Sequence, residues 1–329
     1  MPEALLPQLS DVEAAAARLA GLIVETPLIE SAALNERFGA RILFKPETLQ
    51  RTGSFKFRGA YNKIATIPAA DRQRGVVAFS SGNHAQGVAA AAALFGIGAV
   101  IAMPHDAPAI KINNVRKLGA EIIHFDRFKE DRRAVVEPYI AERGMVLVPP
   151  FDDPAIIAGQ GTIGLELAAQ AIALGVELDA VVIPCGGGGL SSGIALALEG
   201  VSPDTEVWVA EPDGFDDTKR SLESGHRVAN AGGHSSICDA ILTAEPGELT
   251  FAINRKLLEG VAIVSDSDTA AAMQDAAAYL KLIVEPGGAV AFAALSTGAI
   301  PIAGRTVAVV LSGGNVDLDR FAEIIAAGH

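Results

Sequence analysis

Short, continuously apolar segments alternate with alanine-rich segments along most of this chain. Seven of the apolar segments have the length and β-branched content of strands. They are Arg41–Lys45, Val76–Ser80, Ala99–Met103, Glu121–Phe125, Ala180–Pro184, Glu206–Ala210 and Arg305–Leu311. Strands that are apolar on both faces need a layer of helices on each side, and the helical patterns between them supply those layers. The sequence therefore predicts an α/β fold with doubly wound, mostly parallel sheets.

The order of these segments predicts two domains, one inserted into the other. Residues 75–150 hold three strand and helix units, and the proline-rich residues 149–154 end this block. We therefore expect a small domain at 75–150 and a large, discontinuous domain made of 1–74 and 151–329. Near the N-terminus, Ser10 is the expected N-cap of a helix from Asp11 to Leu22.

One apolar run, from Gly87 to Met103, is long enough to resemble a membrane span. Gly96 and Gly98 divide it into an alanine-rich helix and the short strand Ala99–Met103. We therefore expect this run to be buried core.

The charge balance limits the partners of the chain. It carries 26 Lys and Arg against 39 Asp and Glu, with no basic run, which disfavours nucleic acid and anionic membranes. The two cysteines, Cys185 and Cys238, are far apart and form neither a disulfide framework nor a zinc pattern. Residues 1–10 lack the basic and apolar regions of a secretory signal. We expect a cytoplasmic protein that captures any anionic ligand locally.

Four consecutive glycines, Gly186, Gly187, Gly188 and Gly189, follow the predicted strand Ala180–Pro184 and precede a predicted helix. Successive glycine amides can turn toward one anion, and the helix N-terminus adds partial positive charge. A flexible turn is the alternative, but four adjacent glycines carry a large entropic cost without a ligand. The pattern therefore predicts a phosphate site.

The kind of phosphate follows from what surrounds the glycines. Residues 191 and 192 are serines, so the GxGxxG spacing of a dinucleotide site does not fit, and the Walker lysine is absent. Glu211, at the end of the next strand, fits the acid that holds a ribose only in part. A small monophosphate is the better prediction, and a dinucleotide oxidoreductase is the alternative.

Three further loops carry groups suited to chemistry. Lys56 lies between two phenylalanines, where an apolar environment would lower its pKa and make the amine nucleophilic. Alone it reads as a surface lysine, but beside a monophosphate site it becomes a Schiff-base candidate. The loop Ser80–His84 suits helix capping and ligand binding equally, and His84 by itself reads as a structural histidine. Ser312 follows the last strand and can face the same crevice, although a plain turn explains it equally well.

Five motifs together carry a resemblance to a known family. They are Ser54–Ala60, Ser80–Gly87, the glycines at 186–189, Glu285–Ala289 and Ser312–Asn315. In this order they resemble the fold-type II pyridoxal-phosphate enzymes, and within that group the threonine/serine dehydratase and serine racemase family. The likeness extends from about residue 8 to residue 325.

The resemblance implies a role in cofactor binding for each matching residue. Lys56 would carry the cofactor as a Schiff base, Phe55 would pack against its ring, and Asn83 would hydrogen-bond its phenolic oxygen. The glycines at 186–189 would bind its phosphate. Ser312 would face the pyridine nitrogen, where a neutral hydroxyl suits β-elimination better than transamination.

The resemblance also implies where the substrate binds. Its carboxylate would lie against the loop formed by Ser80, Ser81, Gly82, Asn83 and His84. Lys56 would then act as general base on the Cα proton. Ser81 stands where racemases carry a base for the opposite face, so a serine or aspartate racemase with side dehydratase activity is an alternative. Arg132 matches a position that approaches anionic ligands in racemase-like relatives, so 3-hydroxyaspartate is an alternative substrate.

The implied reaction is the α,β-elimination of a β-hydroxy-L-amino acid of the threonine or serine type, giving a 2-oxo acid and ammonia. Where relatives often have Ala-Asp-Gly beside the substrate side chain, this chain has Cys238-Asp239-Ala240, which leaves the substrate open. The non-enzymatic alternative is a binding protein on the same fold, which would lack the lysine or an intact glycine loop.

A metal site and a dimer complete what the resemblance implies. Glu211, the carbonyl of Phe215 and Asp217 would bind Mg²⁺ or Ca²⁺, which prefer such oxygen ligands. A solvated acidic loop is the alternative. The family relationship also predicts a homodimer.

Overall fold

The computed structural model describes residues 6–80, 82–107, 109–126 and 129–327. In these residues nine strands form two sheets in which all neighbouring strands run parallel. The strands are β1 (Arg41–Pro46), β2 (Val76–Phe79), β3 (Ala99–Pro104), β4 (Glu121–Phe125), β5 (Val146–Leu147), β6 (Ala180–Pro184), β7 (Glu206–Pro212), β8 (Gly260–Val264) and β9 (Thr306–Leu311). The larger sheet has the order β1-β9-β6-β7-β8 and the smaller one the order β4-β3-β2-β5. The predicted α/β class is confirmed.

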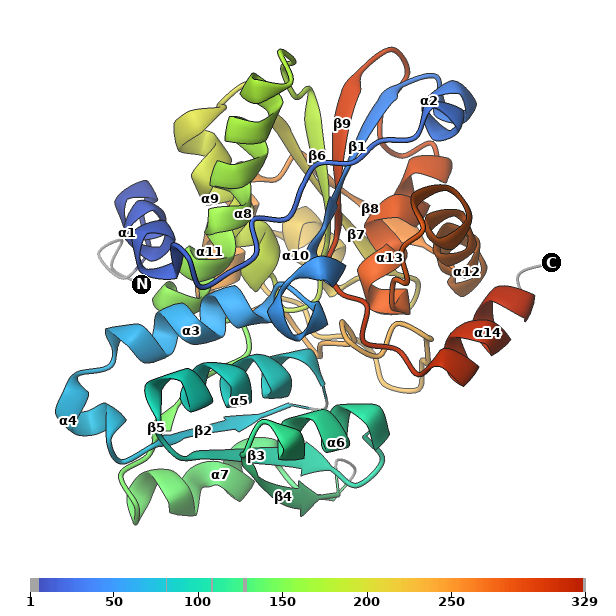
Figure 1. Cartoon of the computed structure of the whole chain (residues 1–329). Coiled ribbons are helices and arrows are strands. Elements are labelled where there is room, and N and C mark those ends of the chain that lie inside the picture. Colours follow the sequence, from blue (N-terminus) through green and yellow to red (C-terminus); the bar gives the residue numbers. More distant parts are fainter. Residues whose placement is uncertain (1–5, 81, 108, 127–128, 328–329) are drawn as a thin grey trace.

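Helices cover both faces of each sheet. They are α1 (Leu9–Leu19), α2 (Ala32–Phe38), α3 (Lys56–Thr66), α4 (Ala69–Arg72), α5 (Asn83–Phe95), α6 (Ala109–Lys117), α7 (Arg132–Ala141), α8 (Pro154–Ala173), α9 (Gly189–Val201), α10 (Asp217–Ser224), α11 (Glu248–Leu257), α12 (Asp266–Asp275), α13 (Pro286–Ala293) and α14 (Leu318–Ala327). Short 3-10 helices lie at η2 (Glu47–Leu49), η3 (Arg51–Gly53) and η5 (Ala294–Ser296), and a π-helix lies at η4 (Ala276–Leu280). Figure 1 shows α8 and α9 on one face of the larger sheet and α12 and α13 on the other.

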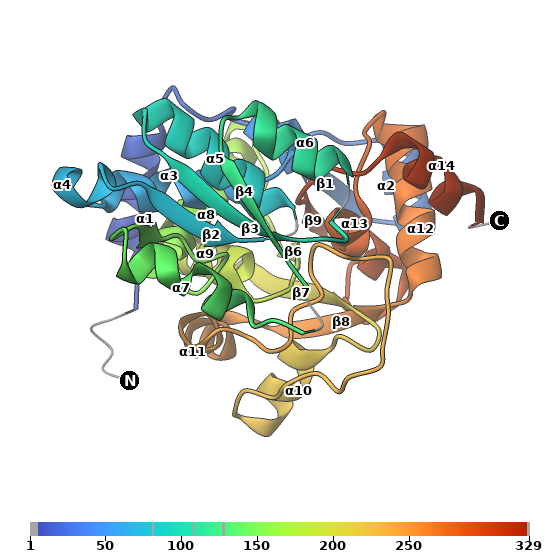
Figure 2. The same cartoon turned by 90° about the horizontal axis from the view of Figure 1, so that it is seen from below.

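Alternation along β2 shows how the smaller sheet is buried. Val76 and Ala78 pack into the core under α5, whereas Val77 and Phe79 pack against α7 on the other face. A strand with period two must therefore be apolar throughout. Seen from below, α5 and α6 lie on one side of this sheet and α7 on the other (Figure 2). The run from residue 87 to 103 is divided between α5 and β3, as predicted.

Helix α3 lies between the two sheets and packs against α5 on one side and α8 on the other (Figure 1). The contact with α8 is close because two glycines meet there. A Cβ on Gly159 would lie 2.6 Å from the Cα of Gly59. Helix α8 is long and apolar enough to cross a membrane, but 67 % of its most apolar window is buried inside the protein, as in a core helix.

Two details of the prediction are wrong. The first helix begins at Leu9 and ends at Leu19, because the amide of Gln8 donates to the Asp11 carboxylate at 2.8 Å and Gly21 turns the chain with a φ of +72°. Strands β5 and β8 were not expected. β5 has only two residues, and β8 starts at a glycine, which normally weakens a strand. Here a Cβ on Gly260 would lie 2.5 Å from the Trp208 ring.

The strands of the smaller sheet all lie within residues 75–150, and those of the larger sheet all lie outside this range, so both sheets respect the expected boundaries. Residues 75–150 contain the three expected units, β2-α5, β3-α6 and β4-α7, followed by β5. The division into a small and a large domain stays a prediction.

Candidate active site

A cavity of about 170 Å³ lies where the carboxyl ends of β2, β6 and β9 face one another. Doubly wound sheets bind their ligands at this edge. The predicted site residues that line it are Phe55, Lys56, Ser80, Gly82, Asn83, His84, Arg132, Gly186, Gly187, Gly188, Gly189 and Ser312. Ser81 lies outside the described residues. The predicted cofactor and substrate groups thus meet in one cavity, and their individual roles stay predictions.

Lys56 is the first residue of α3, and its amine points into the cavity. The Nζ atom donates to the carbonyl of Pro150 at 2.8 Å and lies 5.0 Å from the centre of the Phe55 ring. Burial disfavours the ammonium form and lowers the pKa of Lys56 to about 8. The neutral, nucleophilic form of this amine is therefore more populated near neutral pH than it is in an exposed lysine.

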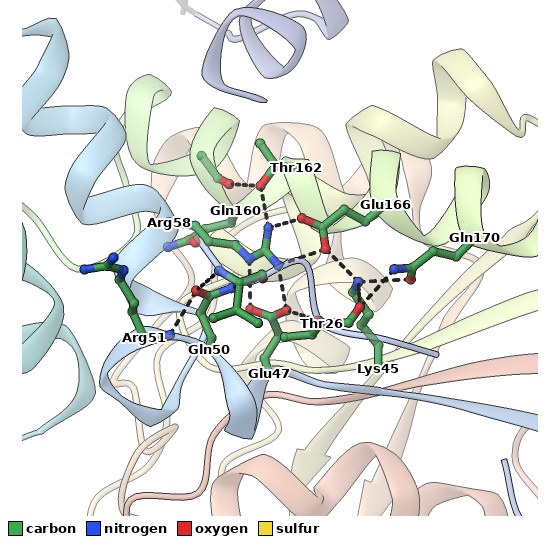
Figure 3. Close-up of polar contacts among 12 residues, drawn as sticks. Thr26, Lys45, Glu47, Gln50, Arg51, Arg58, Gln160, Thr162, Glu166 and Gln170 are labelled. Atoms are coloured by element: carbon green, nitrogen blue, oxygen red, sulfur yellow. Dashed lines mark hydrogen bonds and ion pairs between the residues drawn. The ribbon is translucent and has the colours of Figure 1, made fainter. Parts of the chain in front are cut away.

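Arg58 of α3 meets three charged residues from β1, η2 and α8, and we call these four the ion-pair cluster: Lys45, Glu47, Arg58 and Glu166 (Figure 3). The Arg58 guanidinium donates to Glu47 at 2.8 Å through both Nε and Nη2, and to Glu166 at 2.9 Å. Lys45 Nζ bonds Glu166 at 2.6 Å and Gln170 at 3.1 Å. The bonds of Arg58 hold the first turn of α3, which begins at Lys56, against η2 and α8, and Lys45 joins β1 to α8.

The glycine loop has the geometry of an anion site. Gly188 adopts a φ of +88°, and a Cβ on Gly187 would lie 2.5 Å from the Phe151 ring, so neither position accepts a side chain. Within the described residues, no acceptor takes a hydrogen bond from the amide of any glycine from 186 to 189. Together with the N-terminus of α9, these amides fit a phosphate group.

A second polar group, which we call the cavity cluster, consists of Asn83, His84, Lys111 and Glu285. The Asn83 amide donates to Glu285, and its oxygen accepts from Asn315 at 2.8 Å. His84 Nε2 lies 2.9 Å from the Val148 carbonyl, which leaves the buried Nδ1 atom without a partner in the described structure. Burial and the nearby charge of Lys56 lower the pKa of His84 to about 3, so the imidazole is neutral.

Lys111 was not predicted as a site residue. It comes from α6, is 3 % exposed, and lies 3.1 Å from Asp239 and 3.5 Å from Glu285. Burial lowers the pKa of Lys111, but the two carboxylates outweigh it and raise the pKa overall. The polar sequence around Lys111 is that of an exposed helix, so no pattern in it indicated a buried charge.

Ser312 and Arg132 lie at different depths of the cavity. Ser312 is 5 % exposed, and its backbone carbonyl accepts from the Phe55 amide at 3.1 Å, which holds Ser312 beside the start of α3. Arg132 begins α7 and is exposed, with its guanidinium 5.0 Å from the centre of the Phe79 ring. No acidic residue among those described forms an ion pair with Arg132, so its charge is free for a ligand.

The predicted metal residues lie apart from this cavity. Glu211 is fully buried at the end of β7, and its two oxygens accept from the amides of Thr218 and Lys219 at 2.9 and 3.0 Å. Burial and the charge of Asp217 raise the pKa of Glu211 to about 8, and burial raises that of Asp217 to about 6. One oxygen of Asp217 is buried without a hydrogen-bond partner in the described residues. An orphaned carboxyl oxygen beside a second buried carboxyl offers the oxygen ligands that a divalent cation prefers, but the described residues contain no group of three or more His, Cys, Asp or Glu side chains that could hold a metal.

A desolvated lysine and a glycine loop that fits an anion open onto one cavity, which Ser312 also lines at the end of β9; these features are typical of the site of a pyridoxal-phosphate enzyme. Residues 19–313 match the family of pyridoxal-phosphate dependent enzymes, and the chain belongs to it. The predicted resemblance to fold-type II dehydratases and serine racemases is therefore confirmed.

Individual relatives agree with this placement. L-threo-3-hydroxyaspartate ammonia-lyase of Saccharomyces cerevisiae is 40 % identical over 322 residues, which cover 98 % of this chain and 97 % of the relative. The structure of maize serine racemase has a TM-score of 0.91 at 36 % identity and covers 98 % of this chain and 97 % of its own. The structure of a T.th. threonine deaminase has a TM-score of 0.89 at 43 % identity, with 95 % and 99 % covered.

Proposed function

We propose that the chain is a dehydratase, an ammonia-lyase that converts a β-hydroxy-L-amino acid to a 2-oxo acid and ammonia. The observation that carries this proposal is the opening of the Lys56 amine and the glycine-loop amides onto one cavity. Both features that an inactive binding protein would have lost are present. Bound pyridoxal phosphate supplies an aldehyde for the substrate amine and an electron sink for charge at Cα.

The residues of the chain supply the remaining chemistry. Lys56 would hold the cofactor through its amine and would act as the base that takes the Cα proton, a role that its lowered pKa favours. The glycine amides hold the phosphate, and Asn83 bonds the phenolic oxygen. The amides of the loop from Ser80 to His84 receive the substrate carboxylate at the N-terminus of α5. A neutral Ser312 beside the pyridine nitrogen favours elimination.

The proposed substrates are serine and threonine, with 3-hydroxyaspartate as a second candidate. Arg132 lines the cavity and forms no ion pair with any acidic residue that the structure describes. This favours the second candidate, because an extra carboxylate there would gain a charge-assisted hydrogen bond. A relative with 40 % identity acts on L-threo-3-hydroxyaspartate.

The test measures ammonia and 2-oxo acid release from L-serine, L-threonine and L-threo-3-hydroxyaspartate. Arg132→Leu should lower kcat/KM for hydroxyaspartate by about 10- to 100-fold and change that for serine little. Arg133→Leu is the matched control, because Arg133 lies next along α7 and does not line the cavity. Absence of 2-oxo acid from all three substrates would refute the dehydratase. Equal effects on serine and hydroxyaspartate would refute the role of Arg132.

The racemase alternative has its own assay. Ser81 is proposed as the base on the second face of the substrate, so D-serine formed from L-serine should disappear in Ser81→Ala while elimination continues. Wild-type enzyme that forms no D-serine would exclude this activity.

We further propose that Glu211, the Phe215 carbonyl and Asp217 bind Mg²⁺ or Ca²⁺, on the strength of the buried carboxyls described above.

A cytoplasmic homodimer is proposed as well. Cys185 and Cys238 are buried free thiols, which suits a reducing compartment. The homodimer is proposed from the family relationship alone. Light scattering that gave a mass near 33.9 kDa would refute the dimer.

A further inference from the structure

The glycine loop is supported from behind by α11, a helix that does not line the cavity. Thr250 Oγ1 donates to the carbonyl of Gly187 at 2.7 Å, and the amide of Gly247 reaches the same oxygen at 3.3 Å. Thr250 is fully buried, so water does not compete for this bond. The Gly187 carbonyl is therefore held in one direction by the start of α11.

One helical turn later, α11 supports the next peptide. Asn254 Nδ2 donates to Ser191 Oγ at 3.0 Å, and Ser191 Oγ donates to the Gly188 carbonyl at 3.0 Å. Asn254 is 1 % exposed and Ser191 is fully buried. Residues four apart lie on one face of a helix. Thr250 can therefore bond the Gly187 carbonyl directly while Asn254 supports the Gly188 carbonyl through Ser191.

The direction of these carbonyls decides where the amides point. In a planar trans peptide, the C=O and the N–H of one unit point in opposite directions. A Gly187 carbonyl fixed on α11 therefore directs the amide of Gly188 away from α11, toward the cavity that Gly188 lines. The same argument applies to the Gly188 carbonyl and the amide of Gly189. Glycine peptides rotate freely when unsupported, so this support reduces the entropy lost on binding.

The start of α11 is itself fixed by a side chain from another part of the chain. The carboxylate of Asp152 accepts from the amides of Glu248 and Leu249 at 2.9 Å and of Thr250 at 3.2 Å. Asp152 thus acts as an N-cap from a residue remote in sequence. It follows Phe151, whose ring lies against Gly187.

We propose that Asp152, Thr250 and Asn254 are positioning residues that aim the glycine-loop amides at the cofactor phosphate. The inference rests on the proposed cofactor site. It predicts that these residues affect the affinity for the phosphate group and leave the affinity for the rest of the cofactor unchanged.

The experiment compares two ligands that differ only in the phosphate. Dissociation constants of the cofactor-free protein are measured for pyridoxal 5′-phosphate and for pyridoxal, by the absorbance of bound ligand. Thr250→Val should raise the dissociation constant for pyridoxal 5′-phosphate by about tenfold and that for pyridoxal by less than about twofold. Thr250→Ser keeps the hydroxyl and should restore the wild-type value. The ³¹P resonance of the bound cofactor should shift in Thr250→Val and return in Thr250→Ser.

A second pair of variants keeps the test decisive if Thr250→Val does not fold. Asp153 caps α8 through the amides of Ala155 and Ile156 at 2.9 and 3.2 Å, as its neighbour Asp152 caps α11. Asp152→Ala and Asp153→Ala each remove one N-cap, but only Asp152→Ala should weaken pyridoxal 5′-phosphate more than pyridoxal.

The outcomes separate the inference from the proposal beneath it. If wild-type protein binds pyridoxal 5′-phosphate no better than pyridoxal, the phosphate site itself is wrong. If wild type prefers the phosphate and the Thr250 and Asp152 variants keep that full preference, only the positioning role is wrong. Equal weakening by Asp152→Ala and Asp153→Ala would likewise overturn it.

Discussion

The two polar clusters on either side of α3 are built from similar residues but differ in how completely those residues are paired. In the ion-pair cluster, each of Lys45, Glu47, Arg58 and Glu166 has a hydrogen-bonded partner of opposite charge within it. In the cavity cluster, His84 Nδ1 is buried with no hydrogen bond in the described residues, and Glu285 Oε2 has only the 3.5 Å ion pair with Lys111.

This difference separates a structural role from a ligand-binding one. Buried polar groups in native proteins are normally satisfied, and an orphaned one calls for an unseen partner or a functional role. Burial raises the pKa of Glu285, and the nearby Lys111 opposes that rise. Every charged group of the ion-pair cluster has a partner within it, whereas the cavity cluster keeps one buried ring nitrogen, His84 Nδ1, without a partner in the described residues. Substitutions in the first should therefore affect stability, and substitutions in the second should affect binding and catalysis.

The largest expected effect is on catalysis, from Lys56→Ala. We expect kcat to fall by at least about 10⁴-fold, because the variant lacks the attachment point and the general base together. Stability should stay the same or rise slightly, since a desolvated amine is removed. Activity from coupled 2-oxo acid release and the midpoint of urea unfolding check the two statements. Substantial residual activity would remove Lys56 from the active site.

The second prediction concerns the other side of α3. Arg58→Met should lower the free energy of unfolding by about 3–5 kcal/mol, because it leaves the fully buried Glu47 without its cation. Urea unfolding measures the loss. Adding Glu47→Gln to Arg58→Met removes the uncompensated charge and should recover part of the lost free energy of unfolding. A loss below about 1 kcal/mol for the single variant would mean that the ion-pair cluster is not a structural element.

Sequence alone predicted the residues that line the cavity better than the residues that hold those lining residues in place. Asn83, the glycines and Ser312 belong to local motifs that follow strands, and Lys56 belongs to a local motif at the start of α3; such local patterns can be recognised in a sequence. The pairing of Arg58 with Glu166 joins residues 108 positions apart, and Asp152 reaches Glu248 over 96 positions. Such contacts depend on how α3, α8 and α11 pack, and no periodicity records them.

The same limit explains the errors in the fold. The edge strand β8 depends on the close approach of Gly260 to Trp208, which is a tertiary contact. The parallel sheets were predictable because a strand buried on both faces must be apolar throughout. The end of the first helix at Leu19 depended instead on the turn at Gly21.

The third prediction tests whether the acidic segment from Glu211 to Asp217 binds a ligand, as we propose for the cavity cluster. The pKa values of Glu211 and Asp217 are raised to about 8 and about 6 in the folded chain, so the folded chain holds protons that the unfolded chain releases. Without metal, the stability contributed by these groups is present at low pH and is lost as the pH rises through the folded values toward 8. Melting temperature against pH in EDTA should show this decline.

Saturating Mg²⁺ should reverse the decline, by about 2.7 kcal/mol at a hundred times the dissociation constant. EDTA should also lower activity, because the loop borders the glycine loop: Thr218 Oγ1 lies 3.4 Å from Cys185 Sγ. Asp217→Ala should behave like EDTA-treated protein and respond no further to EDTA. Identical melting curves in EDTA and Mg²⁺ would show that the acidic loop binds no cation.

The smallest expected effect comes from Asn83→Ala, within the cavity cluster. The side chain bonds Glu285 and Asn315, and it lines the cavity where the cofactor oxygen is proposed to lie. Loss of one donor should weaken cofactor affinity about tenfold and shift the absorbance of the bound cofactor. Asn315→Ala is the control, because Asn315 holds Asn83 without lining this cavity. If both variants weaken cofactor binding equally, Asn83 does not contact the cofactor and affects binding only by holding its neighbours in place. A larger effect of Asn83→Ala, together with the spectral shift, supports direct contact with the cofactor. Unchanged affinity and spectrum in Asn83→Ala would place Asn83 with the ion-pair cluster as a structural residue.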